Sequence, residues 1–209
     1  MVEGESEILS VPKLVYKMQV PSLYLTNTYR VHGVSNLISC QQGKWKLVDK
    51  GDGEKWHKYL RNVQKASYVL LLLDGDGPAD SGKRFCVREA AHALADSAKK
   101  VGAGKTFSLA VAFVRQEFES WLLAGCESLC SKLTDGEIAA LEEAPRDAKG
   151  RIREITQAGY NEVRDQPEFV KQLNIGLLST RMRSFRRFEK ALRQLDDAAR
   201  NGVHICTPA

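Results

Sequence analysis

The chain has 209 residues and a formal net charge of +5, with 43% hydrophobic and 27% charged residues, which is the composition of an ordinary soluble domain. No apolar run is longer than a β-strand, and the chain does not begin with basic residues followed by an apolar stretch. We therefore expect neither a membrane span nor a secretory signal. The mild positive charge permits a nucleic-acid partner without requiring one.

The cysteines are odd in number and scattered, which favours free thiols in a reducing, cytoplasmic protein over disulfides. Two of them lie four residues apart, but no nearby histidine or CxxC motif completes a metal site. The five are Cys40, Cys86, Cys126, Cys130 and Cys206.

The first half of the chain predicts alternating helices and strands. VEGESEILSVPKLVYKM begins acidic and continues with a helical pattern, residues 20–60 are polar and irregular, and residues 55–63 form a short helix. Residues 67–73 are continuously apolar and predict a buried strand. A helix over 88–101, a second apolar strand over 107–114 and a further amphipathic helix follow.

Beyond about residue 133 the pattern is helical, with helices expected at 136–143, 149–157, 167–173 and 179–199. The final NGVHICTPA can add a short last strand. The sequence thus predicts an α/β fold with a central, mostly parallel sheet and flanking helices. We expect an α/β domain over residues 1–130 and a helical C-terminal region, residues 131–209, packed on it.

Acidic residues follow both predicted strands. LLLLDGDG places Asp74 and Asp76 at the end of the first strand, and VAFVRQEFE places Glu117, with Glu119 close by, at the end of the second. Ligands of open α/β sheets bind beyond the carboxyl ends of the strands. Since clustered carboxylates repel one another and hard divalent cations prefer oxygen ligands, the pattern predicts a Mg²⁺ or Mn²⁺ site able to act on a phosphodiester.

Each acidic cluster also has a structural explanation. Asp and Gly are turn residues, Glu117 and Glu119 can be the solvated first turn of a helix, and Glu3 with Glu7 can be an acidic N-terminus. The three clusters together favour a site. The four histidines, His32, His57, His92 and His204, have no metal-binding spacing, so the sequence predicts neither a zinc site nor a histidine base.

The chain resembles the Toprim superfamily, the metal-binding fold of topoisomerases, primases and the overcoming-lysogenization-defect nucleases. In that pattern a glutamate follows the first strand and Asp-x-Asp follows a later one; Glu3 in VEGESE and Asp74 and Asp76 in LLLLDGDG fill these places. More closely, the chain is similar to a bacterial family of Toprim-like proteins found beside ABC-type ATPases. The similarity rests on VEGxxE, RQEFESWLLAGCESL at 115–129, YNEVRDQPEFVKQL at 160–173 and RSFRRFEKAL at 183–192.

This resemblance implies a Mg²⁺- or Mn²⁺-dependent nuclease acting on DNA or RNA, the effector subunit of an ATPase-associated phage-defence system. Glu3, Asp74, Asp76 and Glu117 would hold the metal, while Glu7 and Glu117 would complete its shell or serve as base. The family has an apolar strand before VEG that is not evident here, so we expect Glu3 to be poorly anchored. A homo-oligomer is a further possibility.

Basic residues are concentrated in the last third of the chain, and guanidinium groups suit phosphate. The candidates for substrate phosphate are Lys83, Arg115, Arg181, Arg186 and Arg187. Arginines on an amphipathic helix also serve simply to solvate it and pair with Glu189, Asp196 or Asp197.

Two other functions fit parts of the sequence. One is a catalytically weak or inactive Toprim-like subunit that docks on an ABC-type ATPase. The other is a haloacid-dehalogenase phosphatase, whose strand also ends in Asp-x-Asp; that family continues with DxDGT, whereas Pro78 follows Gly77 here.

Overall fold

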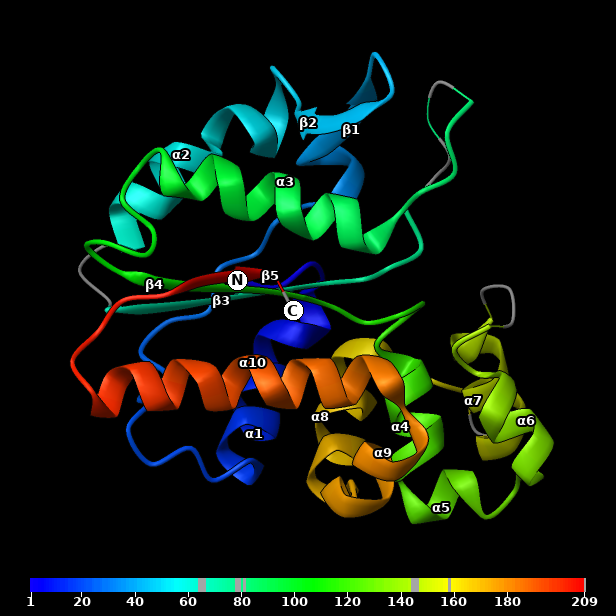
Figure 1. Cartoon of the computed structure of the whole chain (residues 1–209). Helices are drawn as coiled ribbons and strands as arrows, with labels where there is room; N and C mark the ends of the chain where they lie inside the picture. The colour runs from blue at the N-terminus through cyan, green and yellow to red at the C-terminus, as the bar shows by residue number, and fades with distance from the viewer. Residues whose placement is uncertain (64–66, 78–79, 81, 144–146, 158, 209) are drawn as a thin grey trace.

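A three-stranded parallel sheet forms the middle layer of the protein (Figure 1). The computed structural model describes all residues except 64–66, 78–79, 81, 144–146, 158 and 209. The strands are β3 (Tyr68–Leu73), β4 (Ser108–Phe113) and β5 (Cys206–Pro208), in the order β3-β4-β5. The two predicted apolar strands and the short last strand are therefore confirmed, and the α/β class with them.

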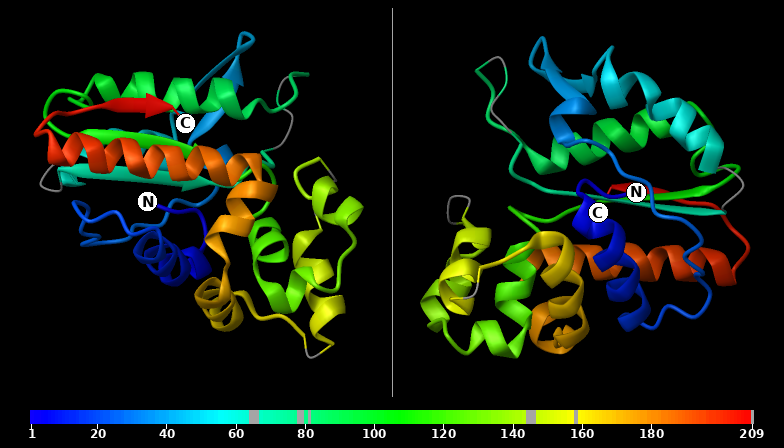
Figure 2. Two further views of the ribbon diagram at one scale, coloured as in Figure 1. Left: turned by 60° about the horizontal axis from the view of Figure 1, so that its bottom comes forward. Right: turned by 180° about the vertical axis from the view of Figure 1, so that it is seen from behind.

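Helices cover both faces of the sheet (Figures 1 and 2). On one face lie α2 (Gly51–Val63), α3 (Val87–Lys99) and a hairpin of β1 (Ile38–Gln41) and β2 (Lys44–Leu47). On the other lie α1 (Glu5–Lys17), α4 (Glu119–Gly125), α8 (Glu162–Gln172), α9 (Ile175–Arg181) and α10 (Arg183–Arg200). Leu71 packs into the first layer and Leu72 into the second, because successive strand side chains point to opposite faces.

Three short helices extend the structure beyond the carboxyl ends of the strands: α5 (Glu127–Cys130), α6 (Asp135–Ala140) and α7 (Ala148–Thr156). They share one hydrophobic cluster with α1 and α10, which contains Trp121, Ile138 and Ile152. Among the described residues, no helix combines the length and apolar character needed to cross a membrane.

The helix expected over residues 179–199 is wrong as a single element, because α9 ends at Arg181 and α10 begins at Arg183. Met182 between them has an extended backbone, with φ −111° and ψ 114°. The carboxylate of Glu142 accepts hydrogen bonds from the backbone N–H groups of Arg183 (3.0 Å) and Ser184 (2.6 Å). The Glu142 carboxylate thus satisfies the free N–H donors at the N-terminus of α10. The helix can therefore be interrupted at Met182.

The segment expected to be irregular contains a hairpin that the sequence analysis missed. Its two-residue loop, Gln42 and Gly43, has φ values of 51° and 73°, as tight hairpin turns require. Each strand has four residues and buries only alternate side chains, so neither forms an apolar run. The helix expected at 55–63 begins earlier, at Gly51.

Glu3 is firmly anchored, contrary to expectation. The backbone N–H of Leu72 donates to the carbonyl of Met1 (3.0 Å), while Val2 exchanges hydrogen bonds with Tyr29 (2.9 Å) and Val31 (2.8 Å). Val2 is buried between β3 and residues 29–31 and bridges Arg30 in parallel. These contacts fix Glu3, the next residue, at the end of β3.

The Glu142 cap generates a prediction about stability. Replacing Glu142 by Ala removes two backbone hydrogen bonds and a favourable charge at the start of α10, and should lower the free energy of unfolding by about 1–2 kcal/mol. Urea unfolding measures this change. The neighbouring exposed Glu143→Ala is the matched control and should change it by less than about 0.5 kcal/mol; equal effects would contradict the capping role.

Candidate functional site

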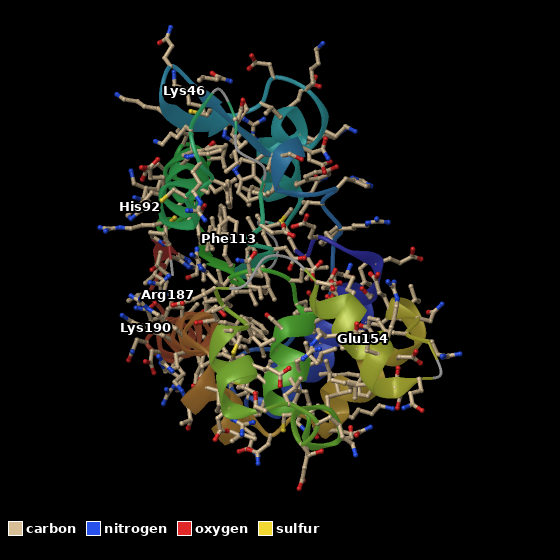
Figure 3. The ribbon with its side chains drawn as sticks, turned by 90° about the vertical axis from the view of Figure 1, so that its right-hand side faces the viewer. Lys46, His92, Phe113, Glu154, Arg187 and Lys190 are labelled. Carbon is tan, nitrogen blue, oxygen red and sulfur yellow. The ribbon has the colours of Figure 1, made fainter. Side chains whose placement is uncertain are left out.

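An acidic pocket of about 670 Å³ lies at the carboxyl ends of β3 and β4. Figure 3 looks onto this side of the molecule, with Phe113, the last residue of β4, near its centre. Carboxylates from four separate segments line the pocket, as the strand-end argument predicts. Its titratable lining residues are Glu3, Glu5, Glu7, Arg30, His32, Asp74, Asp76, Glu117, Lys149, Tyr160 and Glu162.

Gly75, between the two aspartates, is required by close backbone packing. A Cβ atom at this position would lie 2.2 Å from the carbonyl oxygen of Val114, and the Gly75 N–H donates to the Gln116 carbonyl (3.0 Å). The backbone after β3 therefore lies directly against the backbone after β4. This contact brings Asp74 and Asp76 close to Glu117.

Glu3 and Glu7 enter the pocket from the N-terminus and the first turn of α1. The backbone N–H of Asp74 donates to Glu3 Oε2 (3.0 Å). Gly4 makes room for Glu7, because a Cβ there would lie 2.1 Å from Glu7 Oε2. That oxygen is buried and has no hydrogen-bond partner among the described residues.

Glu117 links the strand end to α7. Its Oε2 accepts a hydrogen bond from the backbone N–H of Ala148, the first residue of that helix (3.0 Å). The next residue, Lys149, lines the acidic pocket and pairs with Glu162 (2.9 Å). Glu117 thereby positions the lysine as well as contributing a carboxylate.

Glu119 lies beneath the pocket and is only 1% exposed. Its Oε1 accepts hydrogen bonds from the Tyr160 hydroxyl (3.0 Å) and from Gln166 Nε2 (3.2 Å), and Gln166 Nε2 also lies 3.3 Å from Glu7 Oε1. Gln166 thus ties Glu119 to Glu7. The sequence places Glu119 beside Glu117 but does not predict that Glu119 is buried and hydrogen-bonded. The residues that bond to Glu119 lie more than forty positions away in the chain.

Burial and mutual repulsion raise the pKa values of several carboxyls. Desolvation raises the pKa of Asp74 well above its usual range, and the negative charges of Glu3 and Glu7 add to the shift. Desolvation also raises the pKa of Glu3, although the hydrogen bond from the Asp74 N–H acts in the opposite direction. Desolvation raises the pKa of Glu119 to about 7. Burial alone would lower the pKa of Lys149. The attraction to Glu119 and the hydrogen bond to Glu162 are together stronger, and they raise the pKa of Lys149.

The chemistry of the pocket fits a hard divalent cation. The described His, Cys, Asp and Glu side chains form no ready-made group of three that could hold a metal ion. The donors are nevertheless carboxylate oxygens, the ligands such cations prefer, and Glu7 offers a buried oxygen without a hydrogen bond. A bound cation would offset the desolvation and the mutual repulsion that together raise the pKa of Asp74 and of Glu3.

The five residues predicted to bind substrate phosphate lie outside the pocket lining. Four of them are held by other groups of the protein. Lys83 pairs with Glu89, Arg115 donates to the Glu142 carbonyl, and Arg181 donates to the Ala124 carbonyl. Arg186 donates to two carbonyls at the end of α9. Arg187 is exposed on α10, next to Lys190, on the side of the view away from α7 (Figure 3).

Fold and site together define an α/β protein with a carboxylate-rich pocket at the edge of a parallel sheet. The chain belongs to the family described as a domain of unknown function, DUF4276, whose model matches residues 2–193. No curated protein and no solved structure matches the chain.

The raised pKa of Glu119 predicts a pH-dependent stability. The folded protein binds this proton more tightly than the unfolded chain, so the contribution to stability is greatest below the usual pKa of 4.5 and is lost as the pH rises through about 7. Glu119→Gln should raise the free energy of unfolding at pH 8 by about 1–3 kcal/mol and flatten its dependence on pH.

The measurement is urea unfolding from pH 5 to pH 8 with a chelator present, which removes any metal contribution. The exposed Glu154→Gln on α7 is the control and should leave the pH profile unchanged. A destabilised E119Q with an unaltered pH profile would contradict a buried, titrating Glu119.

Proposed function

We propose that this protein is a divalent-metal-dependent nuclease with a Toprim-like α/β fold, hydrolysing phosphodiester bonds in DNA or RNA. The observation that carries the proposal is the convergence of Glu3, Asp74 and Glu117 on one pocket from separate chain segments. Acids that serve only turns and helix starts would have no reason to converge. Nor would Glu3 and Asp74 need to be held where desolvation raises the pKa of each.

Glu3, Asp74, Asp76 and Glu117 would hold Mg²⁺ or Mn²⁺, with Glu7 completing the shell or accepting a proton from water. When bound, such a cation polarises the phosphate, neutralises developing negative charge and lowers the pKa of a bound water.

The chain's own residues supply orientation and positive charge. Gln166 orients Glu7 through its amide, and Glu117 holds the start of α7 so that Lys149 stays in the pocket. We assign Lys149, rather than the arginines outside the pocket lining, to the substrate phosphate, because it lines the pocket and is held there by the Glu117 contact to α7 and by Glu162.

Nucleic acid fits the rest of the surface. The pocket opens on one side of the molecule, and the chain carries a net charge of +5. Arg187 and Lys190 are exposed on α10, and within the described part of the chain neither forms an ion pair with a carboxylate. Unpaired cations of this kind bind a phosphate backbone without sequence preference.

Replacing Asp74 by Asn tests the proposal with little change of shape. We expect Mg²⁺- or Mn²⁺-dependent cleavage of plasmid DNA or tRNA to fall at least about a hundredfold, since even residues supporting metal ligands cost about 10–100-fold. The fold should persist, because Asn removes a carboxylate that desolvation disfavours. Exposed Asp96→Asn on α3 is the matched control and should cleave normally.

Thermal unfolding supplies the second measurement. At a hundred times its dissociation constant, Mn²⁺ should stabilise the wild-type protein by about 2.7 kcal/mol and stabilise D74N much less. Cleavage that survives in D74N, or a wild-type protein that neither binds Mn²⁺ nor cleaves either nucleic acid, would refute the nuclease.

A docking subunit for an ABC-type ATPase is a second candidate, favoured by exposed apolar side chains on residues 16–29. Tyr16 and Tyr24 are 86% and 87% exposed, and Tyr24 borders a largely apolar groove of about 660 Å³ with Leu25 and Tyr29. Apolar patches of this kind mark interaction surfaces. We also propose that the protein is the effector of a defence system beside such an ATPase, on the basis of its resemblance to the Toprim-like family.

Co-purification with an ABC-type ATPase of the kind that the resemblance implies tests docking. The double variant Tyr24→Ser, Leu25→Ser should reduce capture at least about tenfold, because two exposed apolar anchors are lost. Val203→Ser, at another exposed apolar position, is the control, and D74N should bind normally. Undiminished capture of the double variant would exclude this surface.

A further inference from the structure

Asp52 is a buried carboxylate that the proposed metal chemistry does not use. It lies in the first turn of α2 and is only 3% exposed. Its oxygens accept hydrogen bonds from the His32 backbone N–H (2.5 Å) and the Tyr59 hydroxyl (3.3 Å), and His32 Nδ1 lies 3.1 Å from Oδ2. A buried carboxylate needs such partners, but the contact with the ring does more than satisfy Asp52.

The contact fixes the tautomer and direction of the His32 ring. With Nδ1–H donated to Asp52, the other ring nitrogen, Nε2, carries the chemistry that the side chain can offer. Nε2 has no hydrogen-bond partner among the described residues, and the His32 side chain is 63% exposed. The Nε2 atom of His32 is therefore fixed in position and accessible to a ligand.

His32 also stands at the acidic pocket. It is one of the pocket's lining residues, and Val31 before it bonds to Val2, which precedes Glu3. Gly33 after it has φ +91°, and a Cβ there would lie 3.2 Å from Glu3 Oε1. The backbone around His32 thus lies beside a predicted metal ligand. The charged and titratable lining residues named above share the pocket with His32. Asp52 contacts the ring itself, and Tyr59 on α2 bonds to Asp52.

We propose that His32 is the general acid of the phosphodiester hydrolysis and that Asp52 positions it. This inference rests on the proposed nuclease function and adds to it the group that protonates the leaving oxygen. Nothing in the spacing of the histidines pointed to this role, because Asp52 lies twenty residues along the chain.

The oxygen of a water molecule forms a bond to phosphorus and gives its proton to a pocket carboxylate such as Glu7. The bond from phosphorus to the leaving oxygen breaks, and its electron pair takes up the proton of His32 Nε2–H. The imidazole is left neutral with Nδ1–H still donated to Asp52, and regains its Nε2 proton from solvent.

Dependence on the leaving group separates an acid from a structural residue. His32→Gln should reduce Mn²⁺-dependent plasmid cleavage at least about a hundredfold, since the sugar alkoxide must be protonated as it leaves. Hydrolysis of bis(p-nitrophenyl) phosphate should stay within about threefold of the wild type, because p-nitrophenolate leaves as a stable anion.

Exposed His92→Gln on α3 is the matched control and should act normally on both substrates. Because the His32 backbone N–H and the Tyr59 hydroxyl still donate to Asp52, H32Q should remain folded, as thermal unfolding will show. Equal losses on both substrates, or no loss on plasmid, would overturn the proposal. A wild type inactive on both substrates would refute the nuclease itself.

Nitrogen-15 NMR of the histidine rings tests the arrangement without any catalysis. In the metal-free protein His32 should show an Nδ1–H signal shifted downfield by its carboxylate partner. Asp52→Asn keeps an acceptor for the backbone N–H but should abolish that shift and reduce plasmid cleavage more than hydrolysis of the nitrophenyl ester. A neutral His32 ring protonated at Nε2 would contradict the proposed geometry, whatever the activity.

Discussion

The candidate site depends on one backbone contact between two strand ends. Gly75 donates to the Gln116 carbonyl and lies so close to Val114 that no side chain fits between them. Parallel pairing of β3 with β4 brings the strand ends to the same edge, and the glycine lets the two loops touch. The aspartates of one loop and Glu117 of the other thereby come to share a pocket.

Gathering carboxylates in this way costs free energy, and the structure offsets only part of the cost. Backbone hydrogen bonds reach Glu3 and Glu117, while Lys149 supplies positive charge. The pKa of Asp74 nevertheless remains raised, and one oxygen of Glu7 is buried without a partner. Perturbed carboxyls of this kind cluster at functional sites, and a divalent cation is the ligand that we propose for these oxygens.

The C-terminal helices complete the pocket as well as covering the sheet. Lys149 enters from α7, whose first turn is held by Glu117. Tyr160 donates to Glu119, and Gln166 connects Glu119 to Glu7. From the other face of the sheet, α2 holds His32 through Asp52. The pocket is thus an acidic centre with Lys149 and His32 at its margin, each held by a carboxylate from another element.

The sequence by itself determined the two central strands and the acids that follow them. Continuous apolar runs and strand-end Asp-Gly signals are local, and parallel strands must end at the same edge. Only the tertiary structure decided that Glu142 starts α10, that Glu119 is buried under Tyr160, and that Asp52 orients His32. In each case a side chain satisfies a group between twenty and about forty positions away, and no local pattern encodes such a pairing because it exists only once the layers have packed.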